Sequence, residues 1–169
     1  MCRWSVLAGA IWANLTLASV GYAQQPPTPP PPQPAYGPAV TTDQAKRAVA
    51  AALAEAKKSP YLYVFAVVEP SGSLVYFERM DGAALYAANE SAIRKARTAA
   101  LFKRPTADFF NLMESGHSFV ATVTPELSAS IGGVPLVVDG KIIGGIGVAG
   151  SPSGPIDLAP AEAGANALK

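Results

Sequence analysis

Cysteine and histidine are almost absent from this chain of 169 residues, and their scarcity excludes several kinds of chemistry. Cys2 is the single cysteine, so the chain forms no internal disulfide and no site built from several thiolates. His117 is the single histidine, which excludes a typical zinc site with two histidine ligands. A catalytic cysteine–histidine pair is not expected either, because Cys2 lies at the far N-terminus. The fold must therefore rest on its hydrophobic core.

A surplus of charge of either sign is also lacking. The chain has 13 Lys and Arg against 12 Asp and Glu, and charged residues make up 15% of it. Nucleic acids and anionic membranes attract basic proteins, so we expect neither as a partner. Hydrophobic residues make up 50% of the chain. In a small domain this excess predicts apolar surface that serves an oligomer or a ligand pocket.

Residues 1–23 have the organisation of a cleavable secretory signal. Arg3 supplies the positive charge, residues 5–20 form the apolar stretch, and small residues precede an expected cleavage site after Ala23. An uncleaved membrane anchor is the alternative, but a spanning helix needs about 20 apolar residues. Polar residues interrupt this shorter segment. We therefore expect a secreted or periplasmic protein without stable membrane insertion after cleavage.

Proline dominates the beginning of residues 24–40, which we interpret as a linker. Such a segment favours an extended polyproline conformation and acts as a semi-rigid tether. The alternative is a ligand for a proline-binding module. The remaining residues, 41–169, suffice for one domain with one core.

The apolar pattern of that domain predicts helices alternating with hairpins. Helices are expected at residues 42–58, 90–102 and 106–113 and after Asp157, and strands at 61–68, 74–79, 119–123, 136–138 and 141–148. Strands joined by hairpins, without βαβ alternation, indicate an α+β fold with an antiparallel sheet. Thr42, Thr106 and Asp157 are the expected N-terminal caps of their helices. In the second helix the alanines face inward, whereas Lys95 is expected to point away from the core.

Gly145, Gly147 and Gly150 match the letters of a dinucleotide-binding G-x-G-x-x-G motif. That motif works in the turn from a strand to a helix, where the helix N-terminus binds a pyrophosphate. Here the glycines begin inside the second strand of a hairpin, and the next helix starts several residues too late. They more readily allow a helix or a subunit to pack closely on the strand.

Two isolated residues can be interpreted either as ordinary surface residues or as ligand-binding residues. His117 follows the Gly116 turn as an exposed loop residue, or it acts as an axial ligand of haem iron, which needs only one protein nitrogen. Arg79 is a solvated strand end, or its planar guanidinium binds an anionic group such as a propionate.

Six short motifs, spaced along almost the whole domain, carry a family resemblance. They are Arg79-Met80-Asp81-Gly82-Ala83, Lys95-Ala96-x-Thr98-Ala99, Pro105-Thr106, Gly132-Gly133-Val134-Pro135-Leu136, Asp139-Gly140 and Gly144-x-x-Gly147-Val148-x-Gly150. In this order they resemble the GlcG/HbpS family of haem-binding, or haem-degrading, domain proteins. The resemblance implies a single α+β domain with a five-stranded antiparallel sheet flanked by helices. It also implies self-assembly into homo-oligomers and, in secreted members, haem binding linked to redox sensing.

The resemblance also suggests which residues contact haem. The family's haem-associated threonine falls on Thr98, so Thr98 or His117 is expected near the iron. We expect Arg79, Lys103 or Arg104 near the carboxylates of the macrocycle. The family usually has several carboxylates after the last strand, but this sequence keeps only Asp157 there.

The sequence therefore predicts an exported, tethered and oligomeric domain that binds haem or a related flat, anionic cofactor as an accessory or sensor protein. A non-catalytic assembly module without a cofactor is the first alternative. The second is an enzyme acting on small hydroxy acids, although no nucleophile–base pair or paired carboxylates support it.

Overall fold

The computed structural model describes residues 32–83 and 86–169. The chain divides into two units, 1–31 and 32–169, so the description concerns the second unit. The expected signal at 1–23 and the first part of the expected linker lie outside the described residues. Among the helices that are described, none is both long enough and apolar enough to cross a membrane.

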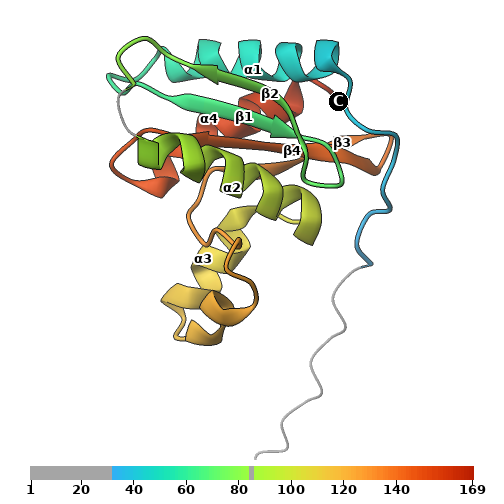
Figure 1. Ribbon diagram of the computed structural model, residues 1–169, viewed down its shortest axis with the longest axis vertical. Coiled ribbons are helices and arrows are strands. Elements are labelled where there is room, and N and C mark those ends of the chain that lie inside the picture. Colours follow the sequence, from blue (N-terminus) through green and yellow to red (C-terminus); the bar gives the residue numbers. More distant parts are fainter. Residues whose placement is uncertain (1–31, 84–85) are drawn as a thin grey trace, which may run out of the picture. The chain divides into compact units, whose positions relative to one another are not determined.

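The described domain is α+β, as predicted, and its strands form an antiparallel sheet in the order β2-β1-β4-β3 (Figure 1). The strands are β1 (Val64–Val68), β2 (Leu74–Arg79), β3 (Gly133–Val138) and β4 (Lys141–Ala149). The helices are α1 (Thr42–Ala56), α2 (Tyr86–Phe102), α3 (Thr106–Glu114), the 3₁₀ turn η1 (Ser118–Thr122) and α4 (Gly154–Asn166).

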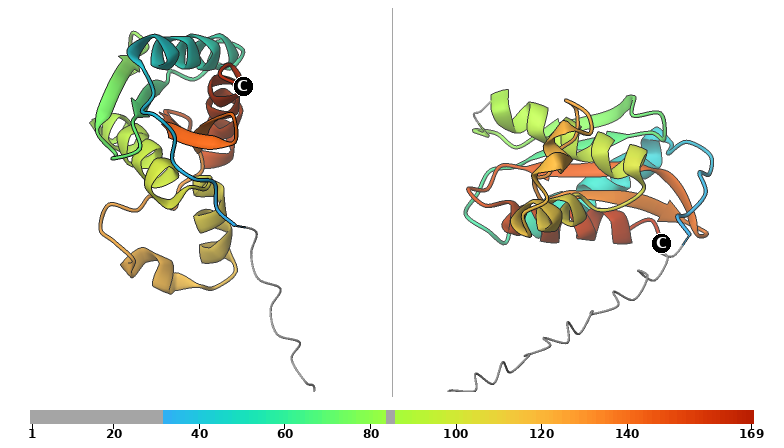
Figure 2. Two further views of the ribbon diagram at one scale, coloured as in Figure 1. Left: turned by 90° about the vertical axis from the view of Figure 1, so that its right-hand side faces the viewer. Right: turned by 90° about the horizontal axis from the view of Figure 1, so that it is seen from below.

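Helices cover both faces of the sheet. Helices α1 and α4 pack together on one face, and α2 lies across β1, β4 and β3 on the other (Figures 1 and 2). Every residue of β1 is buried because both of its faces are covered. Phe65 and Val67 belong to the core beneath α1 and α4, whereas Val64, Ala66 and Val68 belong to the core beneath α2. This arrangement explains the unbroken apolar run of β1.

The expectation of five strands is wrong, because the described sheet has four. The segment expected as the fifth strand, 119–123, instead contributes to η1. Only Val120 of this segment is buried, and it packs with Phe109 and Leu127 in a small separate core. One inward side chain in five residues suits a helical turn, whereas a half-buried strand buries alternate residues.

Several element ends also differ from the sequence-based expectation. Helix α1 is capped by Thr41, not Thr42: the Thr41 hydroxyl accepts from the Gln44 N–H, and the Gln44 side chain accepts from the Thr41 N–H. Helix α2 begins at Tyr86, four residues before the expected start. Thr106 and Asp157 lie inside their helices, and their side chains are used elsewhere, as described below.

The glycines of β4 allow α2 to approach the sheet closely, which confirms the packing interpretation of Gly145 and Gly147. A Cβ at Gly147 would meet the Ala92 carbonyl oxygen and lie 2.6 Å from the Ala96 backbone nitrogen. A Cβ at Gly145 would likewise meet the Ala96 carbonyl oxygen. The backbone of α2 therefore packs directly on the backbone of β4 at these two glycines.

The segment before α1 attaches to the sheet beside β4. Tyr36 forms a parallel bridge with Ile142, and its hydroxyl donates to the carbonyl oxygens of Ala100 and Leu101 at the C-terminal end of α2. The Lys103 ammonium lies 4.1 Å from the centroid of the Tyr36 ring, a cation–π contact. The end of the expected linker is therefore part of the folded domain.

We predict that Gly147→Ala destabilises the domain by about 3 kcal/mol, because the new methyl group meets backbone atoms that cannot rotate away. Urea unfolding of the purified variant measures the loss. Gly116→Ala is the matched control: its Cβ would meet nothing within 4 Å, and only its φ of 89° carries a cost, about 1 kcal/mol. Equal losses in the two variants would contradict the close approach of α2 to β4.

Candidate functional site

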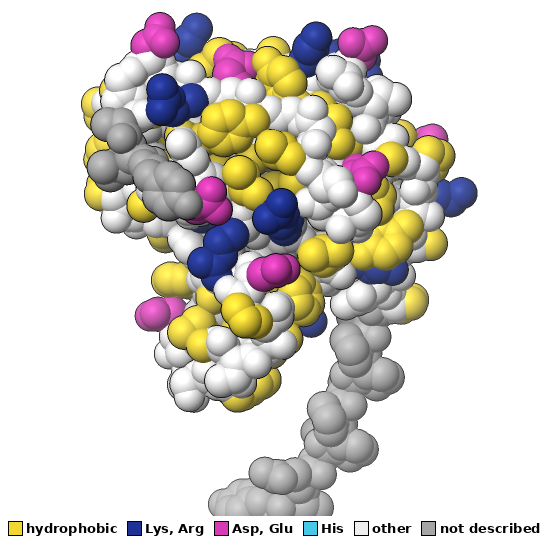
Figure 3. All heavy atoms as spheres, viewed as in Figure 1, with side chains coloured by type: hydrophobic (Ala, Val, Ile, Leu, Met, Phe, Trp, Pro, Cys, Tyr) yellow, Lys and Arg dark blue, Asp and Glu magenta, His cyan; other side chains and the backbone are white. Residues whose placement is uncertain are grey.

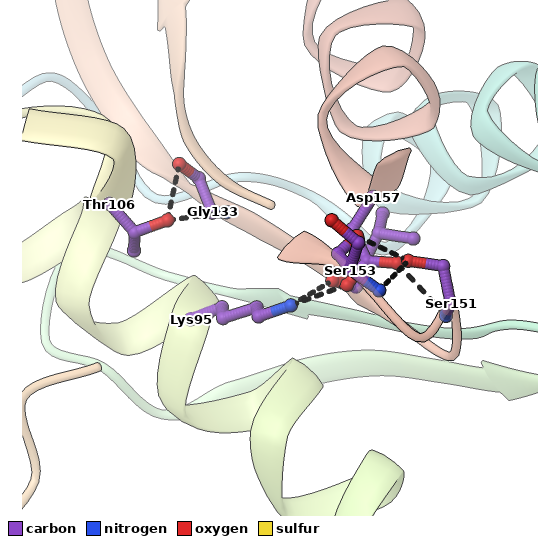
Figure 4. A network of polar contacts seen from close by, with 7 residues as sticks. Lys95, Thr106, Gly133, Ser151, Ser153 and Asp157 are labelled. Carbon is purple, nitrogen blue, oxygen red and sulfur yellow. Dashed lines mark hydrogen bonds and ion pairs between the residues drawn. The ribbon is translucent and has the colours of Figure 1, made fainter. Parts of the chain in front are cut away.

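A buried ion pair connects α2 and α4. Lys95 Nζ lies 2.7 Å from Asp157 Oδ2 and donates to the Val148 carbonyl oxygen at 3.0 Å (Figure 4). The other carboxylate oxygen of Asp157 accepts from the Ser151 N–H at 3.1 Å. The exposed fractions are 1% for Lys95 and 3% for Asp157. Lys95 therefore does not point away from the core, contrary to the sequence-based expectation.

Burial sets the electrostatics of this pair. Loss of water around the ammonium lowers the pKa of Lys95 below its ordinary value, while the Asp157 carboxylate acts in the opposite direction. Asp157 also lies in the first turn of α4, where the helix dipole favours a negative charge. Each charge thus depends on the other for compensation in the interior.

Two adjacent glycines make room for the pair. Gly132 has a φ of 120°, and a Cβ there would lie 2.8 Å from Asp157 Cβ and 3.2 Å from Lys95 Nζ. The next residue, Gly133, donates its N–H to the Thr106 hydroxyl at 2.9 Å (Figure 4). Thr106 therefore binds β3 instead of capping α3, and the network joins α2, α3, α4 and the sheet.

This network lacks the access that a reactive site needs. Both charged side chains are almost fully enclosed and already paired with each other. Among the residues that the structure describes, no group of three or more His, Cys, Asp or Glu side chains could hold a metal ion. The geometry therefore assigns the Lys95–Asp157 pair to the architecture of the domain.

Thr98, the first residue expected near haem iron, is buried on α2 with an exposed fraction of 1%. Its hydroxyl accepts a hydrogen bond from the Ser128 N–H at 2.9 Å. In this structure the hydroxyl thus holds the loop before β3, and its role toward haem stays a prediction.

The three basic residues expected near haem carboxylates lie in different surroundings. Arg79 is exposed at the end of β2 and lines a pocket with Lys57 and Met80. Lys103 is half-buried against Tyr36. Arg104 packs over the Phe109 ring, 4.7 Å from its centroid, and its buried Nε has no hydrogen-bond partner in the described structure.

His117 lies just after α3, on the segment that we call the α3 lobe (residues 106–127). It is exposed; its Nδ1 lies 3.2 Å from Ser115 Oγ, and its ring stands edge-on to Phe119 with centroids 6.0 Å apart. Ser115 also lines a pocket of 390 Å³ together with Arg104. Of the five predicted site residues, only Arg104 lines this pocket, and His117 adjoins it through Ser115. Arg79 and Thr98 lie in other parts of the domain.

Sequence reasoning missed two features of this region. Lys95 belonged to a quoted motif, but a lysine two turns from the end of an alanine-rich helix gave no local signal of burial. Its partner Asp157 is 62 residues away in sequence. Ser115 carried no signal beyond its position next to the Gly116 turn.

We predict that Lys95→Met or Asp157→Leu alone destabilises the domain by about 3–5 kcal/mol, because each leaves an uncompensated charge in the interior. The double variant recovers most of the loss. Urea unfolding of all four proteins gives the coupling energy. Lys58→Met, which removes the exposed ion pair with Glu55, is the control and costs less than about 1 kcal/mol. A double variant as unstable as the sum of the single variants would argue against the pairing.

Comparisons with known proteins agree with this fold. A family model described as haem degrading protein HbpS-like matches residues 40–166. Protein GlcG of Escherichia coli strain K12 is 39% identical over 109 residues, which span 64% of this chain and 80% of GlcG.

Solved structures are similar as well. A crystal structure of a double mutant of Streptomyces reticuli HbpS is 30% identical, with a TM-score of 0.70 over 93% of this chain and 99% of HbpS. The crystal structure of a PduOC:heme complex is 25% identical, with a TM-score of 0.69 over 78% of this chain and 96% of PduOC. Together with the family-model match, the order of the six motifs and the α+β fold place this chain in the HbpS-like family.

Proposed function

We propose that this protein is an exported haem-binding protein with an accessory or sensory role, and that the α3 lobe holds the haem. Membership of the HbpS-like family and the similarity to PduOC, solved as a complex with haem, support a haem-related function. The observation that carries the proposal is His117, the single histidine, exposed beside an aromatic ring.

The surroundings of His117 fit a haem ligand. A ligating imidazole usually has its second nitrogen hydrogen-bonded to a neighbouring group, which fixes the ring. Ser115 Oγ, 3.2 Å from Nδ1, supplies such a neighbour, and Nε2 then serves as the ligating atom. The exposed position of His117 gives a flat macrocycle room to approach.

The α3 lobe also offers an apolar contact for the macrocycle. Met113, Phe119 and Val123 are 39%, 60% and 51% exposed. Apolar side chains that remain exposed near one another mark binding surfaces. Phe119 lies edge-on to His117, so an apolar ring stands beside the proposed ligand.

Arg104 is the residue that we propose to bind the carboxylates of the haem macrocycle. Arg104 lines the pocket that Ser115 borders, together with Asp108. An arginine guanidinium binds carboxylates through charge-assisted hydrogen bonds. Haem, when bound, would supply redox-active iron, while His117 and Arg104 would bind and orient it.

The pocket beside Arg104, at 390 Å³, is at the small end for sites that enclose a whole ligand. We therefore propose that haem lies on the surface of the α3 lobe with one carboxylate edge inserted. An open site of this kind suits exchange or sensing more than permanent storage. The signal-like residues 1–23 and the tether support action outside the cytoplasm.

We predict that the mature chain, beginning at Gln24, develops a shifted Soret band at a definite stoichiometry when titrated with haemin. His117→Ala changes the position of the band and weakens binding, because the nitrogen ligand is lost. Absorption spectroscopy measures both effects.

Thr98→Val, which keeps the shape of the side chain but removes its hydroxyl, tests the other expected ligand. Lys141→Ala, an exposed change on β4, is the control. A featureless titration would contradict haem binding, and a band altered by Thr98→Val but not by His117→Ala would place the iron at α2.

A second candidate, an assembly module without a cofactor, is favoured by the uncovered face of β2. Phe77 and Leu74 pair with Ala66 and Val68 of β1, so they point toward the side of the sheet that carries α2. They are 36% and 46% exposed, and apolar side chains gather over β2 in Figure 3. Leu101 of α2, 43% exposed, extends this apolar surface beside Gly72.

We predict that the mature protein is a homo-oligomer and that Phe77→Asp weakens the assembly at least about tenfold by placing a charge in the contact. Light scattering over a dilution series measures the effect. Phe119→Asp is the matched control and leaves the mass unchanged, because Phe119 lies on the α3 lobe. A monomeric wild type, or loss of assembly only in Phe119→Asp, would contradict the β2 contact.

A further inference from the structure

The hydroxyl of Ser115 lies between the end of α3 and the ring of His117. Ser115 Oγ lies 2.8 Å from the Asn111 carbonyl oxygen and 3.0 Å from the Leu112 carbonyl oxygen, one turn back in α3. It also lies 3.2 Å from His117 Nδ1. A serine hydroxyl has one proton to donate and two lone pairs that accept.

Both carbonyl oxygens lie closer to Ser115 Oγ than His117 Nδ1 does, which favours donation of the hydroxyl proton to the end of α3. The serine oxygen then offers His117 a lone pair, which accepts from a protonated Nδ1. We propose that Ser115 is a positioning residue that holds His117 as the Nδ1–H tautomer. The unprotonated nitrogen is then Nε2, one of the two ring nitrogens through which a neutral imidazole binds a metal.

The end of α3 brings the two side chains together. Gly116, with a φ of 89°, ends the helix in the left-handed region. The N–H groups of Gly116 and His117 donate to the carbonyl oxygens of Met113 and Leu112, the hydrogen-bond pattern of a Schellman turn. This turn fixes the backbone on both sides of Gly116, and the edge-on contact with Phe119 restrains the far side of the ring. The tautomer is thus set by the fold before any ligand arrives.

Because the chain has one histidine, nitrogen-15 NMR of the mature protein reports this tautomer from a single imidazole. We expect the neutral wild type to show a protonated Nδ1 and an unprotonated Nε2. Ser115→Ala shifts the population toward the Nε2–H form, and Ser115→Thr, which keeps a hydroxyl, retains the wild-type tautomer. Ser118→Ala is the control, because it removes a nearby hydroxyl for which the structure shows no contact with the ring.

The claim that this tautomer serves haem binding rests on the proposed function. A haemin titration of the same Ser115 variants therefore tests that claim separately. We expect Ser115→Ala to weaken haemin binding about tenfold, as loss of a second-shell partner does, and Ser115→Thr to restore it.

The two arms separate the two claims. An Nε2–H wild type, or a Ser115→Ala spectrum identical to that of the wild type, overturns the inference whatever haemin does. An Nδ1–H tautomer that Ser115→Ala abolishes supports it, and absence of haemin binding then counts against the proposed function alone.

Discussion

The domain depends on charge compensation between Lys95 and Asp157 in an interior that is otherwise largely apolar. The pair joins α2 on one side of the sheet to α4 on the other through a gap that Gly132 leaves open. Where α2 meets β4, alanine and glycine offer little side-chain interdigitation to fix the position of the helix on the sheet. A directional ion pair with defined hydrogen bonds supplies that specificity, a role best attested for isolated polar groups in apolar interfaces.

The rigid layers and the proposed binding surface are separate parts of the chain. Helices α1, α2 and α4 pack on the sheet, whereas the α3 lobe has its own small core around Phe109 and carries exposed apolar groups. The lobe carries an exposed imidazole and an exposed aromatic side chain, and Arg104 lies just before it. Thr106, bonded to Gly133, anchors the base of the lobe to the sheet. Binding chemistry can therefore change on the lobe without disturbing the core.

Local patterns in the sequence were sufficient for most of the fold. The Asp139-Gly140 turn, with both φ angles positive, forms the β3–β4 hairpin as predicted. A fifth strand was predicted because Phe119 and Val123 are residue types that favour strands. In the structure, Ser118–Thr122 form the 3₁₀ turn η1, which packs in the α3 lobe and not against the sheet. The prediction that Lys95 points away from the core was wrong because its burial depends on Asp157, 62 residues away in the sequence. Ser115 was missed because its role depends on which acceptor atoms lie near its hydroxyl, and the sequence does not show those distances.

Tyr36 connects the segment before α1 to the junction between α2 and α3. Its hydroxyl is bonded to the last turn of α2, and its ring lies under Lys103, the residue with a φ of 56° at which the chain turns toward α3. The segment that leads into α1 is therefore fixed to the junction between α2 and α3, a few residues before the proposed binding surface begins. A change in the α3 lobe that moved this junction would also move the segment that enters the domain.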